Sequence, residues 1–379
     1  MDFALSEERQ MLADTVRRFV DDTYDIATRH ANARRENGFD PKTWLEFAEL
    51  GLIGALQPAH VGGYGGAGED IAIVFETIGR GLVVEPFLAS GVLGASPIVL
   101  AGSTPQREVL AGVIAGTHQL ALAHGEPSGR YALSHVTTRA TPNDDNWTIN
   151  GRKAVVINGD SADTLIVSAR INGGSDDLNG ICLFAVDAKT EGISRRGYTT
   201  VDGGRAAEIE FNDVVVGAGA LLGKAGEGFS LIETTHARGI VAVCAEAIGI
   251  MDVSKDITLD YLRARKQFGR PIGAFQALQH RMVDLLIEIE QARSAVILAA
   301  GSLEADRPVR ERNVSAAKNL VGRVGRLVAE ETIQLHGGIA MTWEYSLPHY
   351  AKRLTMIDHQ LGDTDFHLER FQKFANEVA

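Results

Sequence analysis

Two carboxylates near the end of the chain could remove a proton from a substrate. In the stretch MIDHQLGDTDFH, Asp363 and Asp365 flank Thr364 in a short polar segment, with apolar, helix-like sequence on either side. A carboxylate acts as a general base when it is held within hydrogen-bonding reach of the proton that it takes. A loop fixed between two helices would provide that position, so this segment is the first candidate for catalysis.

A second stretch places a cation and an aromatic ring beside a turn. RARKQFGRPIGAFQ contains Gly269 and Pro271, which favour a turn between two helices, and it offers Arg265 and Phe268 there. Such a pair suits a phosphate group or an aromatic cofactor. A solvated turn with a phenylalanine in the core would give the same sequence.

A pair of glycines follows another helical stretch. ETIQLHGGIAMTWEY places Gly337 and Gly338 after the last helical residue. Two glycines let the backbone come close to a ligand, although a glycine at this point is also an ordinary helix ending. Neither this stretch nor the arginine–phenylalanine turn establishes a function alone.

One acidic residue lies where a charge is costly. Glu246 is surrounded by the apolar sequence GIVAVCAEAIGIM. An unpaired carboxylate is unfavourable in an apolar interior, so Glu246 needs either a partner or a chemical task. An ion pair with an arginine from another helix is the structural alternative to a catalytic role.

The composition narrows the class of protein. The chain has 379 residues and a formal net charge of −12. A duplex-binding surface needs clustered Lys and Arg, so nucleic acid is not an expected partner. The longest apolar stretch, PFLASGVLGASPIVLAG, is interrupted by proline, serine and glycine, which predicts no membrane span. The polar N-terminal sequence MDFALSEERQ predicts a cytoplasmic protein without a signal peptide.

The cysteines give no sign of a disulfide framework or of a metal site. Cys182 and Cys244 each lie in apolar sequence, and their spacing matches no metal-binding pattern. We therefore expect two buried thiols in a reducing compartment and no bound metal.

The periodicity of the chain predicts a mainly α protein with a central β domain. Helical spacing dominates residues 1–118, where Ser6 is a candidate N-cap, and it returns in residues 226–379. Short segments rich in branched residues fill residues 119–225. Within them, Asn150-Gly151 between WTI and RKAVVI predicts a hairpin turn. The expected layout is an N-terminal helical domain, a middle β domain and a C-terminal helical bundle.

Taken in order, these stretches resemble the acyl-CoA dehydrogenase family along nearly the whole chain. The matching segments are MDFALSEERQMLADTVRRF, GEP, NWTINGRKAVVING, AEIEFNDVVV, GEGF, RKQFGRPIGAFQ and QLHGGIAMTWEY. The resemblance implies a middle β barrel or sandwich, a C-terminal four-helix bundle, and assembly as a dimer or tetramer. It also implies FAD as the cofactor and an acyl-CoA thioester as the substrate, which is desaturated between its α- and β-carbons.

The chain departs from the family at the catalytic base. The family places a glutamate, followed by glycine and threonine, in the loop after the double-glycine stretch. With or without a one-residue insertion ahead of the loop, Gly362 or Leu361 stands at that glutamate, and neither accepts a proton. Asp363 and Glu246 are then the candidates for a relocated base. With the insertion, Thr364 aligns with the family threonine, which implies a contact to a neighbour's FAD.

Some relatives carry their base on the first helix of the C-terminal half. That position falls near Gly239, or near Ala237 in a looser alignment, and neither residue is acidic. Glu246 lies about two helical turns further on.

The middle domain departs from the family as well. Positions where the family holds the flavin ring with threonine, serine, tryptophan and threonine carry Gly125, Tyr131, Val155 and Ile157. The chain nevertheless keeps the residues that, in the family, reach across a dimer interface to the adenine and pyrophosphate of the neighbour's FAD. These residues are Arg265, Gln267, Phe268, Gln334, Gly337 and Gly338.

The loss of the flavin-ring contacts, together with the retained contacts to a neighbour's FAD, predicts that this chain is the partner subunit of a heteromeric acyl-CoA dehydrogenase. The expected assembly is a heterotetramer with a second chain of the family. The sequences ALAHGEP and RKAVVINGDSAD are most similar to small subunits of this type, such as that of pimeloyl-CoA dehydrogenase. Dicarboxylic acyl-CoAs, fatty acyl-CoAs and steroid side chains are all compatible substrates. Two alternatives stay open: a self-sufficient homo-oligomer that uses Asp363 or Glu246 as its base, and a flavin-free scaffold that binds acyl-CoA or protein.

Overall fold

The computed structural model describes residues 6–378 and divides into two compact units. The first unit comprises Met1–Ala31, Ala67–Val83 and Ile240–Ala379, and the second comprises Asn32–Gly66 and Val84–Gly239. The order of elements confirms the predicted class, with helices at both ends of the chain and strands between them. The domain boundaries at 118/119 and 225/226 stay predictions.

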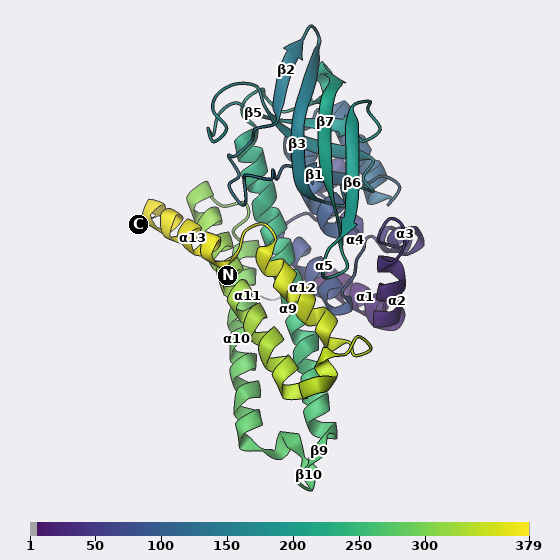
Figure 1. The fold of residues 1–379 in the computed structure, drawn as a ribbon, viewed down its shortest axis with the longest axis vertical. Helices are drawn as coiled ribbons and strands as arrows, with labels where there is room; N and C mark the ends of the chain where they lie inside the picture. Colours follow the sequence, from purple (N-terminus) through teal and green to yellow (C-terminus); the bar gives the residue numbers. More distant parts are fainter. Residues whose placement is uncertain (1–5, 379) are drawn as a thin grey trace. The chain divides into compact units, whose positions relative to one another are not determined.

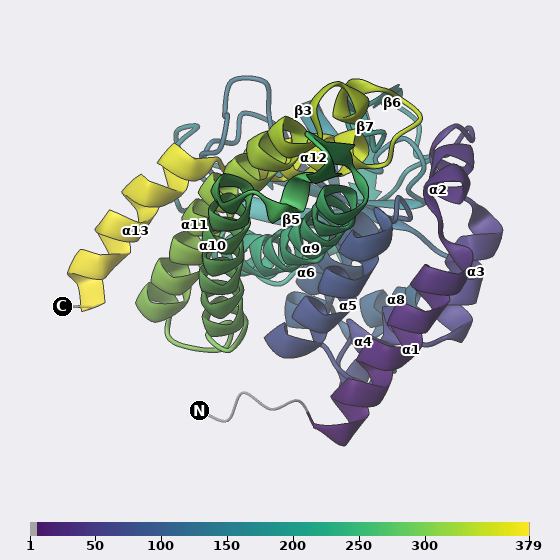
Figure 2. The ribbon, with the colours of Figure 1, turned by 90° about the horizontal axis from the view of Figure 1, so that it is seen from below.

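The first unit is helical. Its elements are α1 (Glu7–Thr23), most of α2 (Ile26–Ala33), α5 (Gly68–Gly81), the later part of α9 (Gly228–Ala264), β9 (Lys266–Gln267), β10 (Arg270–Pro271), η4 (Ile272–Ala274), α10 (Gln276–Ala300), α11 (Arg307–His336), η5 (Gly337–Met341), α12 (Leu347–His359) and α13 (Thr364–Val378). Figure 1 shows α10 and α11 side by side, and Figure 2 views them nearly end-on. Ser6 caps α1 as predicted, since its hydroxyl accepts a hydrogen bond from the Arg9 backbone N–H at 3.3 Å.

The second unit contains short helices and the sheet. The helical segments are α3 (Pro41–Glu49), α4 (Leu52–Ala55), η1 (Ala59–Val61), η2 (Phe87–Gly94), α6 (Ala95–Ala101), α7 (Thr104–Arg107), α8 (Val109–Ile114), η3 (Ala218–Ala220) and the start of α9. The strands are β1 (Leu120–Ala123), β2 (Arg139–Asn143), β3 (Asn146–Ile157), β4 (Thr164–Arg170), β5 (Ile181–Asp187), β6 (Ile193–Thr199), β7 (Arg205–Gly217) and β8 (Leu221–Leu222).

The strands form one mixed sheet around a buried apolar core. Their order is β6-β7-β3-β2-β4-β5-β8, and β1 pairs with β4 in parallel. Alternate residues of the strands pack into the core, among them Ile149, Leu165, Phe184 and Phe211, which are at most 1% exposed. Cys182 belongs to this core and Cys244 is buried in α9, so the expectation of two buried thiols is confirmed.

The hairpin predicted at Asn150-Gly151 is wrong. Strand β3 continues through both residues, and its pairing with β7 shifts register between Ile149 and Gly151. Gly151, with φ of 151°, lies in a β-bulge and not in a turn. The hairpin between β2 and β3 instead turns at Asp144-Asp145, where Asp144 takes the positive φ of 50°.

No helix in residues 6–378 combines the length and the apolar character needed to cross a membrane. Those residues likewise contain no cluster of three or more His, Cys, Asp or Glu side chains that could hold a metal ion.

Two glycines allow α5 and α9 to approach closely. A Cβ atom at Gly249 of α9 would overlap the backbone oxygen of Glu76, and one at Gly79 of α5 would overlap the backbone oxygen of Glu246. Backbone atoms cannot move aside as a flexible side chain can. The absence of side chains at these two positions therefore sets the spacing of the two helices.

We expect Gly249→Ala to lower the free energy of unfolding by about 2 kcal/mol or more, because the added methyl group overpacks the contact with α5. Gly325→Ala is the matched control. It lies within α11, where an added Cβ would meet Leu354 at an ordinary 3.5 Å, so helix propensity should stabilise the variant by up to about 1 kcal/mol. Guanidinium unfolding measures both changes, and equal losses in the two variants would contradict the close contact.

Candidate active site

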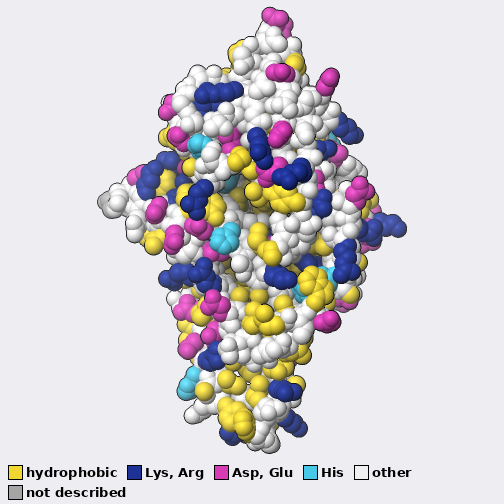
Figure 3. All heavy atoms as spheres, viewed as in Figure 1, with side chains coloured by type: hydrophobic (Ala, Val, Ile, Leu, Met, Phe, Trp, Pro, Cys, Tyr) yellow, Lys and Arg dark blue, Asp and Glu magenta, His cyan; other side chains and the backbone are white. Residues whose placement is uncertain are grey.

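The arginine–phenylalanine turn lies exposed after α9. The β9–β10 pair forms a tight turn in which Phe268 has φ of 52° and Gly269 has φ of 80°. Phe268 is 90% exposed, and Arg265 and Gln267 are exposed beside it. Figure 3 shows hydrophobic side chains gathered at the foot of the view, over this turn and the adjoining helix ends. A ring held this far out of the core indicates a surface that another molecule covers.

The double-glycine turn lies at the end of α11. Gly337 has φ of 69°, and a Cβ atom at Gly337 or Gly338 would have no other atom within 4 Å. Gln334 is exposed one turn earlier. Unlike Gly249, these glycines are not required by packing within the described chain. The open backbone is therefore available to a ligand.

The structure brings these two turns to the same end of the first unit. Tyr261, one turn before Arg265, stacks on His336 with ring centroids 4.4 Å apart, and His336 directly precedes Gly337. Six of the seven residues predicted to contact a neighbour's FAD are exposed and lie at these two turns, whereas Thr364 is half-buried at the start of α13. The interpretation of Phe268 as a core residue is wrong, because its ring is almost entirely accessible.

The loop between α12 and α13 is held from within. Lys318 of α11 is fully buried, and its ammonium donates to the backbone oxygens of Asp358, at 2.9 Å, and of Gly362, at 2.6 Å. His367 Nε2 donates to the backbone oxygen of Leu361 at 2.9 Å. Burial lowers the pKa of Lys318. Leu361 has φ of 59°, a conformation that such a bulky residue adopts only where its surroundings enforce it.

The acidic residues of this loop have structural contacts. Asp363 precedes α13 and accepts a hydrogen bond from the Phe366 backbone N–H at 2.9 Å, which is the geometry of an N-cap. The Thr364 hydroxyl donates to Asp358 Oδ1 at 2.7 Å. Asp365 is exposed in the first turn of α13. The candidate base Asp363 and the candidate FAD contact Thr364 thus both stabilise the start of a helix.

Glu246 is paired, as the structural alternative expected. Both carboxylate oxygens accept from Arg353 of α12, at 2.5 Å from Nε and 2.6 Å from Nη2. Glu246 is 6% exposed. A fork-shaped guanidinium on both oxygens satisfies the hydrogen-bonding capacity of the buried carboxylate. Proton abstraction by Glu246 would first require breaking this pair.

The flavin-ring positions of the middle domain offer no matching polar side chains. Gly125 and Val155 are exposed and lie close together, because the Ala154 backbone N–H donates to the Gly125 oxygen at 2.8 Å. Val155 has φ of 53°, which is rare for a β-branched residue, and Ile157 is half-buried. Tyr131 is also half-buried.

Sequence reasoning missed two buried lysines. Besides Lys318, Lys153 of β3 is fully buried and donates to Glu126 Oε1 at 2.8 Å, to Ser168 Oγ at 2.9 Å and to the His124 oxygen at 3.2 Å. Burial lowers the pKa of Lys153 to about 8. Each lysine lies within apolar sequence, Lys153 in KAVVI and Lys318 in SAAKNLV. A charge in apolar sequence is the same signal that singled out Glu246.

The sequence and the structure both match one family. Residues 6–117, 121–214 and 226–375 match the N-terminal, middle and C-terminal domains of acyl-CoA dehydrogenases. A probable acyl-CoA dehydrogenase of Bacillus subtilis, YngJ, is 31% identical over 379 residues, which cover 96% of this chain and 97% of the relative. The chain belongs to the acyl-CoA dehydrogenase family. It is an oxidoreductase that acts on a CH–CH bond, in a family that typically depends on FAD.

Further relatives agree with this assignment. A short-chain-specific acyl-CoA dehydrogenase of Megasphaera elsdenii is 30% identical, covering 84% of this chain and 86% of its own. The structure of butyryl-CoA dehydrogenase from the same organism superimposes with a TM-score of 0.92 at 26% identity, covering 99% of this chain and all of that one. A variant of the steroid enzyme Tcur3481-Tcur3483 gives a TM-score of 0.88 at 29% identity and 98% coverage of both chains.

The residues of this chain fit one end of FAD better than the other. Arg265, Phe268 and the open Gly337-Gly338 backbone suit a diphosphate and an aromatic base. At the ring end, Gly125 and Val155 supply no polar side chain. A flavin ring bound there would depend on backbone groups for its hydrogen bonds.

We expect Arg353→Met to lower the free energy of unfolding by about 3 kcal/mol, because it leaves the buried Glu246 carboxylate unpaired. The double variant Glu246→Gln/Arg353→Met should be more stable than Arg353→Met, since no isolated charge then stays buried. Urea unfolding of the wild type, both single variants and the double variant measures the coupling. Additive losses would show that the two residues do not stabilise each other.

Proposed function

We propose that this chain is one subunit of a heteromeric acyl-CoA dehydrogenase and completes an FAD site that lies on a second chain of the family. The observation that carries the proposal is that the chain keeps the family's FAD contacts at one end of the cofactor and lacks those at the other. The exposed Arg265–Phe268 turn and the Gly337-Gly338 turn are in place, whereas the flavin-ring positions Gly125 and Val155 lack polar side chains.

The state of the carboxylates supports this proposal. Gly362 or Leu361 stands at the family's base position, in a loop that Lys318 holds in an ordered conformation. Asp363 caps α13 and Glu246 is bound on both oxygens by arginine. A self-sufficient enzyme would need one of these groups to exchange its contact for a substrate proton. A base on the second chain needs no such exchange.

In this arrangement, FAD supplies the redox chemistry by accepting hydride from the acyl chain. This chain contributes charge and shape. The Arg265 guanidinium would neutralise a diphosphate, the Phe268 ring would pack against an adenine, and the Gly337-Gly338 backbone would leave room for phosphate oxygens. Gln267, Gln334 and Thr364 complete the predicted set of contacts.

The relatives supply precedent for the assembly. The steroid acyl-CoA dehydrogenase Tcur3481-Tcur3483 bears the names of two proteins, and it is 29% identical to this chain over 98% of its length. We propose a heterotetramer with an acyl-CoA as its substrate.

Expressed alone, the chain should contain little FAD and oxidise no acyl-CoA, because it lacks both a flavin-ring cradle and a base. Co-expression with acyl-CoA dehydrogenase-like products of neighbouring genes should yield a yellow complex. Visible absorption and dye-linked turnover with a panel of acyl-CoAs measure both properties. A flavin-replete, active homo-oligomer would overturn the proposal, and loss of that activity in Asp363→Asn would then identify a relocated base.

In the co-expressed complex, Arg265→Ala should weaken FAD binding about tenfold or more, through the loss of a charge-assisted contact. Arg263→Ala is the matched control, since Arg263 is also exposed and its ion pair with Asp260, at 3.4 Å, lies on the helix itself. Flavin release during dilution reports the affinity. Equal retention of FAD in the two variants would contradict a role for Arg265.

A further inference from the structure

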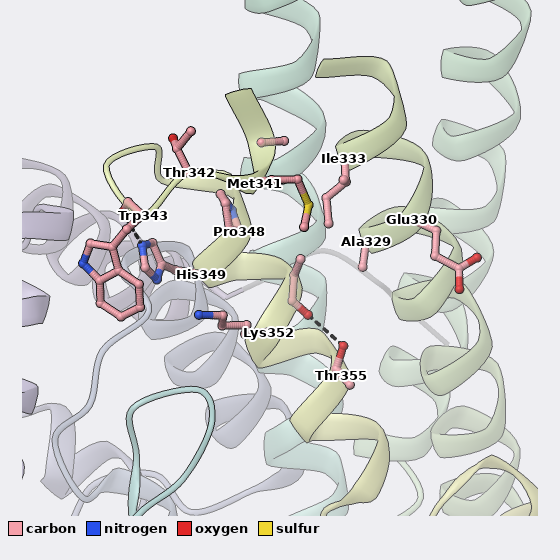
Figure 4. Close-up of a pocket in the computed structure, with 12 residues that line it drawn as sticks. Ala329, Glu330, Ile333, Met341, Thr342, Trp343, Pro348, His349, Lys352 and Thr355 are labelled. Atoms are coloured by element: carbon pink, nitrogen blue, oxygen red, sulfur yellow. Dashed lines mark hydrogen bonds between the residues drawn. The ribbon is translucent and has the colours of Figure 1, made fainter. Parts of the chain in front are cut away.

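The first unit contains a cavity that the proposed function does not use. It has a volume of about 410 Å³ and lies between α11, η5 and α12 (Figure 4). It is lined by Ala329, Glu330, Ile333, Ala340, Met341, Thr342, Trp343, Pro348, His349, Ala351, Lys352 and Thr355. Small-molecule sites commonly span about 300–1,000 Å³, so this cavity suits a compound far smaller than an acyl-CoA.

Small side chains create the space. Ala329, Ala340 and Ala351 are buried at 7%, 0% and 7% exposure, and they come from the three elements that surround the cavity. Ile333 and Met341 add apolar wall. The cavity is open to solvent on one side, where Met341 and Trp343 are 74% and 56% exposed, so an apolar body would bury one face against these side chains.

One end of the cavity is built from aromatic rings. The Trp343 ring stacks on His30 of α2 at 5.3 Å and meets His349 edge-on at 4.8 Å, while His349 packs against His30 at 4.3 Å. His349 Nε2 also donates to the Trp343 backbone oxygen at 2.9 Å. Two ring contacts therefore hold the indole, and the hydrogen bond from His349 holds its backbone, although Trp343 is 56% exposed.

The same end carries positive charge. The Lys352 ammonium lies 4.7 Å from the centre of the Trp343 ring, and Figure 4 shows it extending toward the indole. Burial lowers the pKa of His349, and the charges of Arg29 and Lys352 lower it further. Glu330, the acidic residue in the lining, is exposed on α11. A single carboxylate next to Lys352 would be attracted to this end, and an ammonium over an indole keeps donors free for it.

We propose that this cavity binds a small amphipathic carboxylate. Its alkyl or aryl body would lie against Ala329, Ala340 and Ala351, and its carboxylate would lie beside Lys352. The lining residues Ala340 and Met341 belong to η5, which begins with Gly337-Gly338, but none of the proposed FAD contacts lines the cavity. It would give the protein a second ligand, of the size of a medium-chain or aryl carboxylic acid.

Trp343 provides a direct signal for binding. The chain has three tryptophans, of which Trp44 is 1% exposed and Trp147 belongs to the sheet of the second unit. Titration of the full-length protein with octanoate or phenylacetate should change the tryptophan fluorescence saturably, and Trp343→Phe should abolish that change. 1-Octanol, which has the same chain length as octanoate and no charge, should bind at least about tenfold more weakly. The comparison of octanoate with phenylacetate distinguishes an alkyl body from an aryl body.

Two variants separate the charge from the cavity. Lys352→Met should weaken octanoate binding about tenfold and leave 1-octanol unaffected. Lys373→Met is the matched control, because Lys373 also lies over a ring, 5.5 Å from the centre of Phe374, but outside the cavity. Ala329→Leu should fill the cavity and abolish binding of both compounds, with a circular dichroism spectrum like that of the wild type. Absence of a saturable signal, or equal octanoate affinity in Lys352→Met and Lys373→Met, would overturn the proposal.

Discussion

A buried ammonium fixes the loop on which the functional account depends. Lys318 donates to the backbone oxygens of Asp358 and Gly362, so it ties the end of α12 to the approach to α13. An ammonium in a dry interior is stable only when its protons are accepted, and here two carbonyls bind it in place of water. The loop therefore keeps a defined shape although no glutamate stands in it. Where the family resemblance predicts a glutamate, the chain has Gly362 or Leu361 within an ordered loop.

The candidate carboxylates of the first unit, like Lys318, have partners. Glu246 and Arg353 neutralise each other, and Asp363 satisfies the first turn of α13. Each carboxylate that could replace the missing glutamate thus already has a stabilising contact. The two turns differ, since the Phe268 ring is 90% exposed and meets Phe275 edge-on, at 6.1 Å between ring centres, and a Cβ atom at Gly337 would have no atom within 4 Å. These exposed groups support the proposal that the chain contributes to a site shared with another molecule.

Sequence reasoning predicted the fold well, because periodicity, glycine positions and the family resemblance agreed along the chain. It located the Arg265 and Gly337 turns but could not show that Tyr261 and His336 join them. It misplaced the β2–β3 turn, because Asn-Gly tolerates positive φ equally in a turn and in a bulge. It also overlooked Lys318, whose partners are backbone oxygens that no side-chain pattern records.

The central claim is that the chain completes a flavin site on a different chain. Native mass spectrometry of the purified complex counts subunits and FAD molecules together, without assuming a substrate. The account predicts equal numbers of the two unlike chains and one FAD for each unlike pair. One FAD for every chain, or an FAD-loaded assembly made of this chain alone, would contradict it.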